Sequence, residues 1–175
     1  MSSAFKIENI DSLIELAKSK DPRAQSELIV LTQQRLFKFC ILLGNNRELA
    51  EDLCQEAYIK AFNSLARLNS PDSFYPWLCQ IAKNLFFDIK RKKAEVLSSN
   101  EDQNFEAATA DRQLESIVQV QKVLRTFDPE DRYLLLLVEL EGLSYRETAE
   151  MLKTTEDAIR SKLHRLRQEF VKKLN

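Results

Sequence analysis

The stretch GLSYRETAEMLKTTEDAIRSKLHRLRQEF, residues 142–170, predicts two short helices joined by a tight turn. The first helix begins with a capping box, in which the Ser144 hydroxyl accepts a backbone N–H and Glu147 accepts the N–H of Ser144. The polar segment 153–155 ends this helix, and a threonine in it caps the next one, whose first turn is acidic. Two helices arranged in this way are typical of a helix-turn-helix.

The second helix of this stretch is amphipathic, with a basic outer face. Its spacing predicts burial of Ala158, Ile159, Leu163, Leu166 and Phe170. Its outer face carries Arg160, Ser161, Lys162, His164, Arg165 and Arg167. A recognition helix in a DNA groove has such a face, and so does an ordinary helical hairpin with a solvated charged side. This stretch alone is compatible with both.

The composition predicts an almost wholly helical chain. Among 175 residues there are only two glycines and four prolines, and 30% are charged, so the turn residues that strands require are missing. No apolar run is long enough to span a membrane, and the first residues lack the basic start and apolar core of a signal peptide. We therefore expect a cytoplasmic protein with no membrane insertion.

The chemistry-bearing residues do not form a catalytic or metal-binding pattern. Cys40, Cys54 and Cys79 are odd in number, widely spaced and set in apolar helical patterns, which predicts small buried hydrophobic side chains instead of a disulfide or zinc site. The single histidine, His164, has no partner that would make it a ligand or base. Because a Gly-rich phosphate loop, an activated nucleophile and paired carboxylates are also missing, we expect no enzyme and no cofactor.

The formal net charge of −1 hides two basic patches. Residues 83–93 hold five basic side chains against one acidic, and residues 160–175 hold six against one. Between them, residues 94–113 hold five acidic side chains against one basic. Because phosphate affinity follows local charge, two basic patches separated by an acidic tether favour a nucleic-acid partner.

The first half of the chain predicts a helix with a concentrated acidic face. Residues 10–44 read as two helices, the second capped by Asp21 with Pro22 in its first turn. The segment 44–46 ends it, and another helix follows over residues 47–66. The apolar residues that the helical period places on its inward face are Leu49, Leu53, Ala57, Ala61 and Leu65. Another face gathers the polar and acidic residues Glu48, Asp52, Gln55 and Glu56. A cluster of acidic side chains on one face indicates a basic partner surface; the alternative is an ordinary solvated face.

Aromatic residues then precede a basic helix. Residues 68–75 predict a loop, and Pro76 and Trp77 open a helix that runs to Lys93. Helix geometry brings onto one side of it Trp77, Asn84, Asp88 and Arg91. An aromatic loop beside a basic helix suits capture of an unstacked base. The alternative is that Phe74, Tyr75 and Trp77 are core side chains.

The fold class predicted from these elements is all-α, with two small helical domains joined by a flexible acidic linker. The segment 95–111 has no apolar periodicity and is longer than the usual connection between helices within one compact domain. The predicted boundaries are 1–93 for the first domain, 94–113 for the linker and 114–175 for the domain that holds the helix-turn-helix. In the last domain, Asp128 and Pro129 start a helix, and the apolar run 134–138 predicts the centre of the second core.

Three blocks, in this order and separated by a variable linker, resemble the extracytoplasmic-function sigma factors, the smallest members of the bacterial sigma-factor family. The blocks are AEDLCQEAYIKAF (50–62), SFYPWLCQIAKNLFFDIKRKK (73–93) and EGLSYRETAEMLKTTEDAIRSKLHRLR (141–167). The resemblance covers roughly residues 11 to 173. A lone helix-turn-helix is weak evidence of a family, but three blocks in register are strong.

The resemblance implies that the chain binds core RNA polymerase and directs it to a subset of promoters. The side chains implied to dock on the basic clamp helices of the largest polymerase subunit are Asp52, Gln55 and Glu56. Those implied to melt and read the promoter element near the start site, capturing bases from the melted single strand, are Phe74, Tyr75, Trp77, Lys83, Asn84, Asp88 and Arg91. Those implied to face the more distant element in duplex DNA are Arg160, Ser161, His164, Arg165 and Arg167. The acidic linker resembles the segment threaded through the RNA exit path, and an anti-sigma factor is expected to silence the protein.

The chain also departs from the family pattern. Lys153 stands where glycine is common in the turn, Glu156 and Asp157 replace a small uncharged run, and His164 occupies a variable position. These departures bear on promoter sequence and not on the fold. Two rival interpretations are a two-domain regulator that binds duplex DNA without polymerase, and a helical adaptor with no DNA role.

Overall fold

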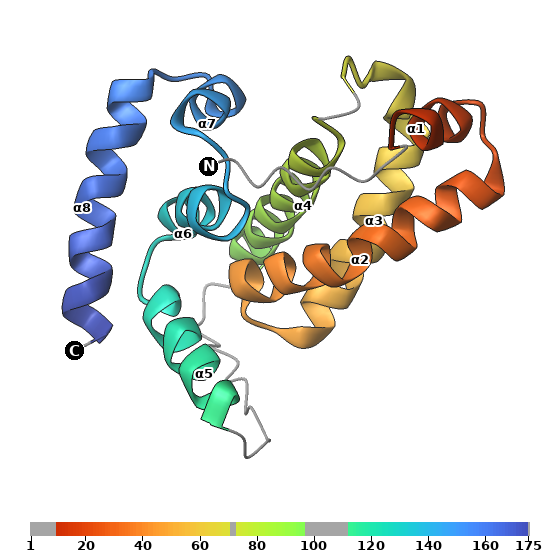
Figure 1. Cartoon of the computed structure of the whole chain (residues 1–175). Helices are drawn as coiled ribbons and strands as arrows, with labels where there is room; N and C mark the ends of the chain where they lie inside the picture. The colour runs from red at the N-terminus through yellow and green to blue at the C-terminus, as the bar shows by residue number, and fades with distance from the viewer. Residues whose placement is uncertain (1–9, 71–72, 97–111, 175) are drawn as a thin grey trace. The chain divides into compact units, whose positions relative to one another are not determined.

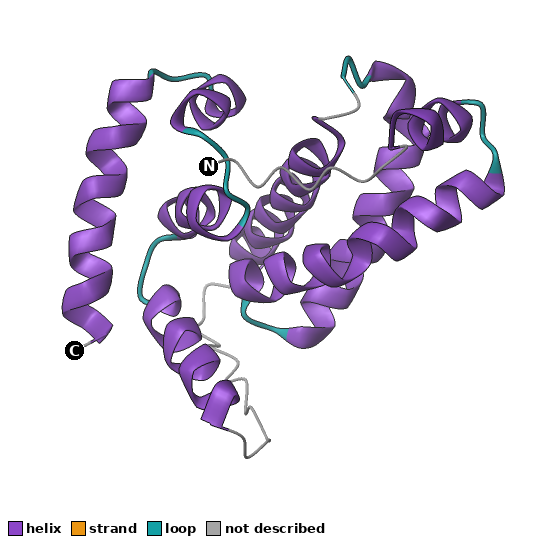
Figure 2. Cartoon of the chain, in the orientation of Figure 1, coloured by secondary structure: helices purple, strands orange, loops and turns teal. Residues whose placement is uncertain are grey.

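The computed structural model describes residues 10–70, 73–96 and 112–174, and within these ranges it contains helices and no strand (Figure 2). The first compact unit contains α1 (Ile10–Lys18), α2 (Pro22–Gly44), α3 (Arg47–Ser64), the 3₁₀ turn η1 (Leu65–Arg67) and α4 (Phe74–Val96). The second contains α5 (Arg112–Arg125), α6 (Pro129–Leu135), the π-helical turn η3 (Leu136–Leu140), α7 (Tyr145–Leu152) and α8 (Glu156–Leu174). The predicted all-α fold class is confirmed.

Three long helices form the first core. α2, α3 and α4 pack against one another, and α1 lies on α2 (Figure 1). Each helix contributes one apolar stripe to the interior, and the fully buried members include Leu28, Leu36, Phe39, Leu43, Leu53, Ala57, Ala61, Leu78 and Ala82. The inward positions predicted for α3 are confirmed, except that Leu49 is only half-buried. The 3.6-residue period thus decides which face of α3 stays outside.

The ends of these helices follow the expected local chemistry. The Asp21 carboxylate accepts the N–H groups of Arg23 and Ala24, both at 2.9 Å, and Pro22 occupies the first turn of α2. α2 ends at Gly44, after which Asn45 takes a left-handed conformation with φ of 53°. The Asn46 side chain then accepts the N–H of Leu49 at 2.7 Å and caps α3. Asparagine tolerates the left-handed region, so this sharp turn needs no glycine.

Several element boundaries differ from those predicted. α4 begins at Phe74, two residues before the predicted start, and continues to Val96. α5 begins at Arg112, so both ends of the predicted linker 94–113 are helical. The rest of that predicted linker lies outside the described residues. In the described parts of the chain, no helix combines the length and apolar character that crossing a membrane requires.

The second core is centred on the apolar run that the sequence singles out. Residues 134–137 are buried, together with Val123, Leu124 and Phe127. Phe127 also stacks on Phe170 of α8, with ring centroids 6.2 Å apart. α8 packs on α5, α6 and α7, so one long helix closes this core. The prediction that this run forms the centre of the second core is confirmed.

A buried arginine, missed by the sequence analysis, holds the turn between α5 and α6. Arg132 donates to the carbonyl oxygens of Leu124 at 2.9 Å, Arg125 at 3.3 Å and Phe127 at 3.2 Å. The carbonyls of Leu124 and Arg125 lie in the last turn of α5, where carbonyls have no partner within the helix, and that of Phe127 lies in the turn that follows. The predicted side-chain cap at Asp128 is not made, although Pro129 does begin α6. The Arg132 guanidinium thus provides hydrogen bonds to the carbonyls at this turn, while the Asp128 carboxylate does not cap α6.

Replacing Arg132 by Met keeps the side-chain length and removes its donors. We expect Arg132→Met to lower the free energy of unfolding by about 2 to 3 kcal/mol, because buried carbonyls lose a charged partner. Urea denaturation followed by circular dichroism measures this loss. The control Arg146→Met, at an exposed arginine that forms a surface ion pair with Glu150, should cost less than about 0.5 kcal/mol. Equal midpoints for the two variants would contradict the role assigned to Arg132.

Candidate docking and nucleic-acid interfaces

The first helix of the predicted helix-turn-helix is started by the expected capping box. Glu147 N–H donates to the Ser144 hydroxyl oxygen at 3.2 Å, and the Glu147 carboxylate accepts the N–H of Ser144 at 2.8 Å. Both the capping box and the start of α7 at Tyr145 are confirmed. The fully buried Thr148, which the sequence analysis did not single out, donates its hydroxyl to the carbonyl of Ser144 at 2.8 Å and locks the first turn further.

The turn between α7 and α8 is closed by a lysine in a conformation that favours glycine. Lys153 has φ of 54° and ψ of 49°. Its N–H bonds to the carbonyl of Glu150 at 3.3 Å, and the N–H of Thr154 bonds to that of Ala149 at 2.9 Å. This pair of bonds is the Schellman pattern, which commonly uses glycine at this position. Lysine at position 153, where glycine is common, therefore leaves the turn geometry intact.

α8 begins at a threonine cap and buries one stripe. The Thr155 hydroxyl accepts the N–H of Ala158 at 3.2 Å. Ile159, Leu163 and Leu166 are buried, as predicted, whereas Phe170 is only half-buried. Ala158 was predicted to be buried, and that prediction is wrong: the residue is exposed. It lies four residues before Lys162 and seven before Arg165, so helix geometry puts it on their face.

The basic side chains of α8 are engaged to different degrees. Arg160 pairs with Asp157 of its own helix at 2.8 Å, and the His164 ring nitrogen lies 3.1 Å from the Gln168 side-chain nitrogen. Lys162 pairs with Asp131 of α6 at 2.5 Å. Among the described residues, Arg165 has no hydrogen bond or ion pair. Arg165 is therefore the α8 arginine whose guanidinium is least committed within this unit.

Arg167 is tied into the body of its unit. Its guanidinium lies 2.6 Å from the Glu139 carboxylate and donates to the Tyr145 hydroxyl at 2.8 Å. Hydrogen bonds to Tyr145 and then to Glu139 raise the pKa of Arg167. These contacts link α8 to η3 and α7. The geometry thus gives Arg167 a positioning role, which its place on the basic face did not reveal.

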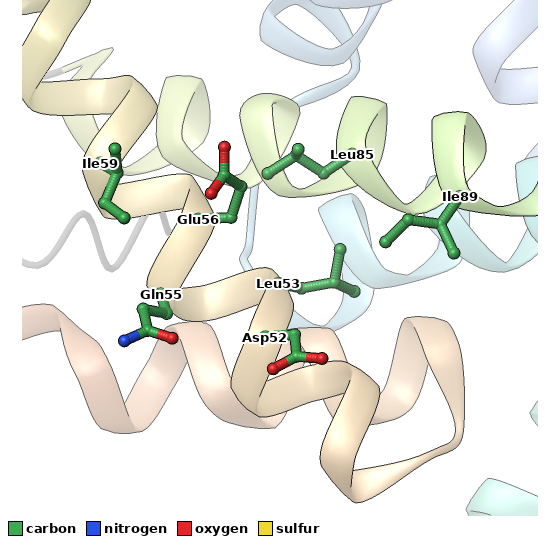
Figure 3. Close-up of a pocket in the computed structure, with 7 residues that line it drawn as sticks. All are labelled: Asp52, Leu53, Gln55, Glu56, Ile59, Leu85 and Ile89. Carbon is green, nitrogen blue, oxygen red and sulfur yellow. The ribbon is translucent and has the colours of Figure 1, made fainter.

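Polar side chains of α3 lie on one side of a small hollow that α3 and α4 line together (Figure 3). Asp52, Gln55 and Glu56 line its rim on α3, and the apolar lining comes from Leu53, Ile59, Leu85 and Ile89. The cavity measures about 280 Å³ and lies between α3 and α4. Ile59 is 51% exposed, so about half of this apolar residue faces solvent beside the hollow.

The carboxylates on this rim have no basic partner in the described parts of the chain. Asp52 and Glu56 are exposed and form no ion pair there, whereas the neighbouring Glu51 pairs with Arg47 at 3.0 Å. Unpaired carboxylates around an apolar hollow suit a basic surface that carries an apolar side chain. We call Asp52, Gln55, Glu56 and Ile59 the α3 rim.

The aromatic residues before the basic helix are placed differently from the prediction. Phe74 and Tyr75 lie in the first turn of α4 instead of in a loop, and both are buried. The Tyr75 ring faces the Arg35 guanidinium at 4.1 Å, and Phe74 lies 6.5 Å from Trp77. The core alternative therefore holds for Phe74 and Tyr75. Trp77 is half-buried and keeps part of its ring outside.

The polar side of α4 is aligned as its spacing predicts. Asn84 is exposed, and Arg91 pairs with Asp88 at 2.8 Å. Lys83 lies 5.0 Å from the centre of the Phe87 ring, and Lys90, absent from the predicted set, lies 5.5 Å from that of Phe86. In both cases it is the ammonium nitrogen that lies over the aromatic ring, which is the geometry of a cation–π interaction.

Family models match both halves of the chain. The model for sigma-70 region 2 matches residues 28–96, and the model for sigma-70 region 4 matches residues 117–170. Together the two matches take in more than half of the 175 residues.

The chain belongs to the extracytoplasmic-function sigma factor family.

Curated relatives of this sigma factor come from several bacteria. The ECF RNA polymerase sigma factor SigE of Mycolicibacterium smegmatis is 33% identical over 82% of this chain, which spans 59% of that relative's length. The RNA polymerase sigma-H factor of Pseudomonas aeruginosa is 26% identical over 95% of this chain and 94% of its own. The sigma-E factor of Escherichia coli is 29% identical over 89% of each.

Solved structures share the fold of this sigma factor. CnrH in complex with the cytosolic domain of CnrY is 22% identical, with a TM-score of 0.69 over 91% of this chain and 92% of that one. RpoE of Bartonella quintana, in complex with the anti-sigma factor NepR, is 22% identical, with a TM-score of 0.66 over 85% and 95%.

The family membership gives the chain a general role. Sigma factors are transcription initiation factors and not enzymes, and region 4 is their DNA-binding helix-turn-helix. The region 2 match takes in most of α2 and all of α3 and α4, and the region 4 match runs from α5 into α8. The α3 rim and the polar side of α4 therefore lie in region 2, and the basic face of α8 lies in region 4.

Substitutions at two residues with positive φ should change the free energy of unfolding in opposite directions. Lys153→Gly should raise the free energy of unfolding by about 0.5 to 1 kcal/mol, because a left-handed conformation strains any residue that has a Cβ. Gly142→Ala should lower it by about 1 to 2 kcal/mol, because Gly142 has φ of 70°. Since a Cβ at Gly142 would meet no atom within 4 Å, this loss is purely conformational.

Urea denaturation of the full chain measures both changes. Lys153→Ala is the matched control, because alanine removes the long side chain and keeps the Cβ, so it should not stabilise the protein. A Lys153→Gly variant no more stable than Lys153→Ala would show that the turn carries no such strain.

Proposed function

We propose that this sigma factor acts in the cytoplasm, where it binds core RNA polymerase and directs it to a subset of promoters by contacting two upstream elements. One observation carries the proposal: a single chain combines sigma region 2, whose acidic rim has no ion pair among the described residues, and region 4, with a basic helix-turn-helix. Residues 1–93 dock on the polymerase and melt the promoter element near the start site. Residues 114–175 bind the distal promoter element, and residues 94–113 connect the two domains through the RNA exit path.

The α3 rim is the proposed polymerase contact. Its carboxylates face the basic clamp helices of the largest subunit, and Ile59 with the hollow beside it receives an apolar side chain from the same surface. Exposure of Asp52 and Glu56 and their lack of an ion pair among the described residues support this assignment. Within the described parts of the chain, these two carboxylates have no ion pair to break before they form intermolecular ones.

The polar side of α4 is the proposed contact with the melted element near the start site. Trp77 supplies the partly exposed ring, Asn84 and Lys83 supply donors, and the Asp88–Arg91 pair flanks them. Stacking on such a ring contributes roughly 1 to 3 kcal/mol per base, which is comparable with the few kcal/mol that unstacking costs. Phe74 and Tyr75 stabilise the first turn of α4 from inside, and Trp77 alone of the three aromatics contacts the base.

The outer face of α8 is the proposed contact with the distal element in duplex DNA. Ser161, His164 and Arg165 are exposed there, and the exposed Ala158 leaves room for a close approach. The ion pair of Arg160 with Asp157 is a surface pair worth about 0 to 1 kcal/mol, so a phosphate or base edge can replace Asp157. Arg167 contributes by holding α8 in place.

An anti-sigma factor is the proposed regulator. The RpoE chain from Bartonella quintana shares this fold and was solved with the anti-sigma factor NepR. An anti-sigma factor that covers the α3 rim and the outer face of α8 would block both functions at once. A pull-down from the native cell that recovers only polymerase subunits would count against this regulator.

Charge reversal on the rim tests polymerase docking. Asp52→Arg with Glu56→Arg should reduce co-purification with core polymerase at least tenfold, because like charges then face the clamp helices. Far-UV circular dichroism should remain that of the native helical fold. The matched control reverses two exposed glutamates elsewhere, Glu27→Arg with Glu150→Arg, and should bind as the native chain does. A DNA-binding regulator that works without polymerase would be unaffected by either change.

Substitution of two arginines of α8 should distinguish a residue that contacts DNA bases from one that positions the helix. Arg165→Ala should lose about 1 to 3 kcal/mol of discrimination between cognate and altered distal elements, with the melting temperature unchanged. Arg167→Ala should lower the free energy of unfolding by about 1 kcal/mol and weaken all promoters alike. Run-off transcription with core polymerase over a set of altered promoters, together with thermal melts, measures both. If Arg160→Ala with Arg165→Ala changes transcription from no promoter, a helical adaptor with no DNA role accounts better for the chain.

A further inference from the structure

The first turn of α8 carries an acidic side chain on the face that is proposed to meet DNA. Asp157 lies four residues before Ser161 and seven before His164, so helix geometry puts the three side chains on one face. All three are exposed. Glu156 is exposed as well, but one residue corresponds to a rotation of about 100° around the helix axis, which takes Glu156 away from that face. Asp157 is thus the acidic residue of this turn that belongs to the outer face.

The Asp157 carboxylate is accessible and held from one side. Its side chain is 88% exposed, and its Oδ1 atom accepts a hydrogen bond from the Arg160 Nη1 atom at 2.8 Å. This bond ties the carboxylate to the next turn of the helix. An ionised carboxylate only accepts hydrogen bonds, and its two oxygens offer about four lone-pair sites. One donor from Arg160 therefore leaves capacity for a donor from another molecule.

A carboxylate that enters a DNA groove needs such a donor. Contact with DNA removes water from the carboxylate, and a desolvated charge without a hydrogen-bond partner is unfavourable. In a helix-turn-helix, the residues near the N-terminus of the recognition helix contact base edges in the major groove. Asp157 stands at such a position, so the base opposite it decides whether the carboxylate is compensated.

The four bases differ in what they present in the major groove. Guanine presents two acceptors, thymine presents an acceptor and a methyl group, and adenine presents a donor beside an acceptor. Cytosine presents its N4 amino donor with no acceptor of its own, and this amino group is the one that aspartate pairs with. Cytosine is therefore the base that compensates the Asp157 carboxylate best.

We propose that Asp157 is a specificity-determining residue that selects cytosine at one position of the distal promoter element. This rests on the proposed function of the outer face of α8. The carboxylate accepts a hydrogen bond from cytosine N4, and it also disfavours guanine and thymine, whose acceptor atoms it repels. If a phosphate or base edge draws Arg160 away, the carboxylate loses its internal donor and its need for cytosine becomes stronger.

Glu156 provides a matched control. Both carboxylates lie in the first turn of α8, where negative charge interacts favourably with the helix dipole. Removing either one therefore has a similar effect on the helix, whereas only Asp157 lies on the outer face. A change of base preference that occurs at Asp157 and not at Glu156 separates recognition from helix stability.

Run-off transcription with the full chain and core RNA polymerase tests the proposal. Every single base-pair substitution is made in the distal element of a promoter fragment from which the native chain initiates. The amount of transcript from each substituted promoter, relative to the parent, gives the base preference at each position. The same set is measured with the variants Asp157→Ala, Asp157→Asn, Glu156→Ala and Arg165→Ala, and far-UV circular dichroism checks that each keeps the helical fold.

The native chain should require a C·G pair in one orientation at one position, with a loss of at least about fivefold for the other pairs. Asp157→Ala should reduce this preference to within about twofold at that position alone, because no carboxylate remains to be compensated. Asp157→Asn should shift the preference at the same position to adenine, because asparagine pairs bidentately with adenine N6 and N7. Glu156→Ala should keep the native preferences.

Several outcomes would overturn the role of Asp157. These are a native profile in Asp157→Ala, a loss spread evenly over all positions, an equal change in Glu156→Ala, or a change at a position where the native chain prefers an A·T pair. If Arg165→Ala alters the profile and Asp157→Ala does not, the outer face of α8 still reads the distal element and only the role of Asp157 is rejected. A native chain that initiates from no fragment, or ignores every distal substitution, rejects the proposed function of α8 as well. Asp157→Asn keeps the side-chain shape and decides the question if Asp157→Ala fails to fold.

Discussion

Each half of this sigma factor must bury an apolar stripe from every one of its helices inside a small core of its own. This constraint sets the rotation of each helix about its axis, and the rotation decides which charged residues face outward. With Leu53, Ala57 and Ala61 inside, Asp52 and Glu56 are necessarily outside. With Ile159, Leu163 and Leu166 inside, Ser161 and Arg165 take the outer face of α8. The proposed binding surfaces are thus consequences of core packing.

Charge pairing then sorts the outward side chains into two kinds. Some form ion pairs that hold the unit together, as Arg167 does with Glu139 and Lys162 does with Asp131. Others, such as Asp52, Glu56 and Arg165, have no such partner among the described residues. The difference matters because a charge that is already paired must give up a partner before it binds another molecule. Total net charge, at −1, carries none of this information.

Much of the fold could be predicted because its signals are local. The capping box at Ser144, the cap at Asp21 with Pro22, and the apolar periods of α3 and α8 each depend on residues a few positions apart. The failures were positions where local signals conflict or are incomplete. Asp128 has the chemistry of a cap, but its carboxylate makes no cap bond and Arg132 holds the preceding turn instead. Phe74 and Tyr75 follow a proline-containing segment that reads as loop, yet their large rings are drawn into the core as the first turn of α4.

The sequence by itself determined the helical class, the order of the elements, the family and the faces that carry charge. It could do so because helix period and capping repeat within one or two turns. Only the tertiary structure decided which charged side chains are committed to partners and which aromatic rings are buried. These properties depend on contacts between α2, α3 and α4, or between α8 and the helices under it, and no spacing along the chain encodes the distance between two helices.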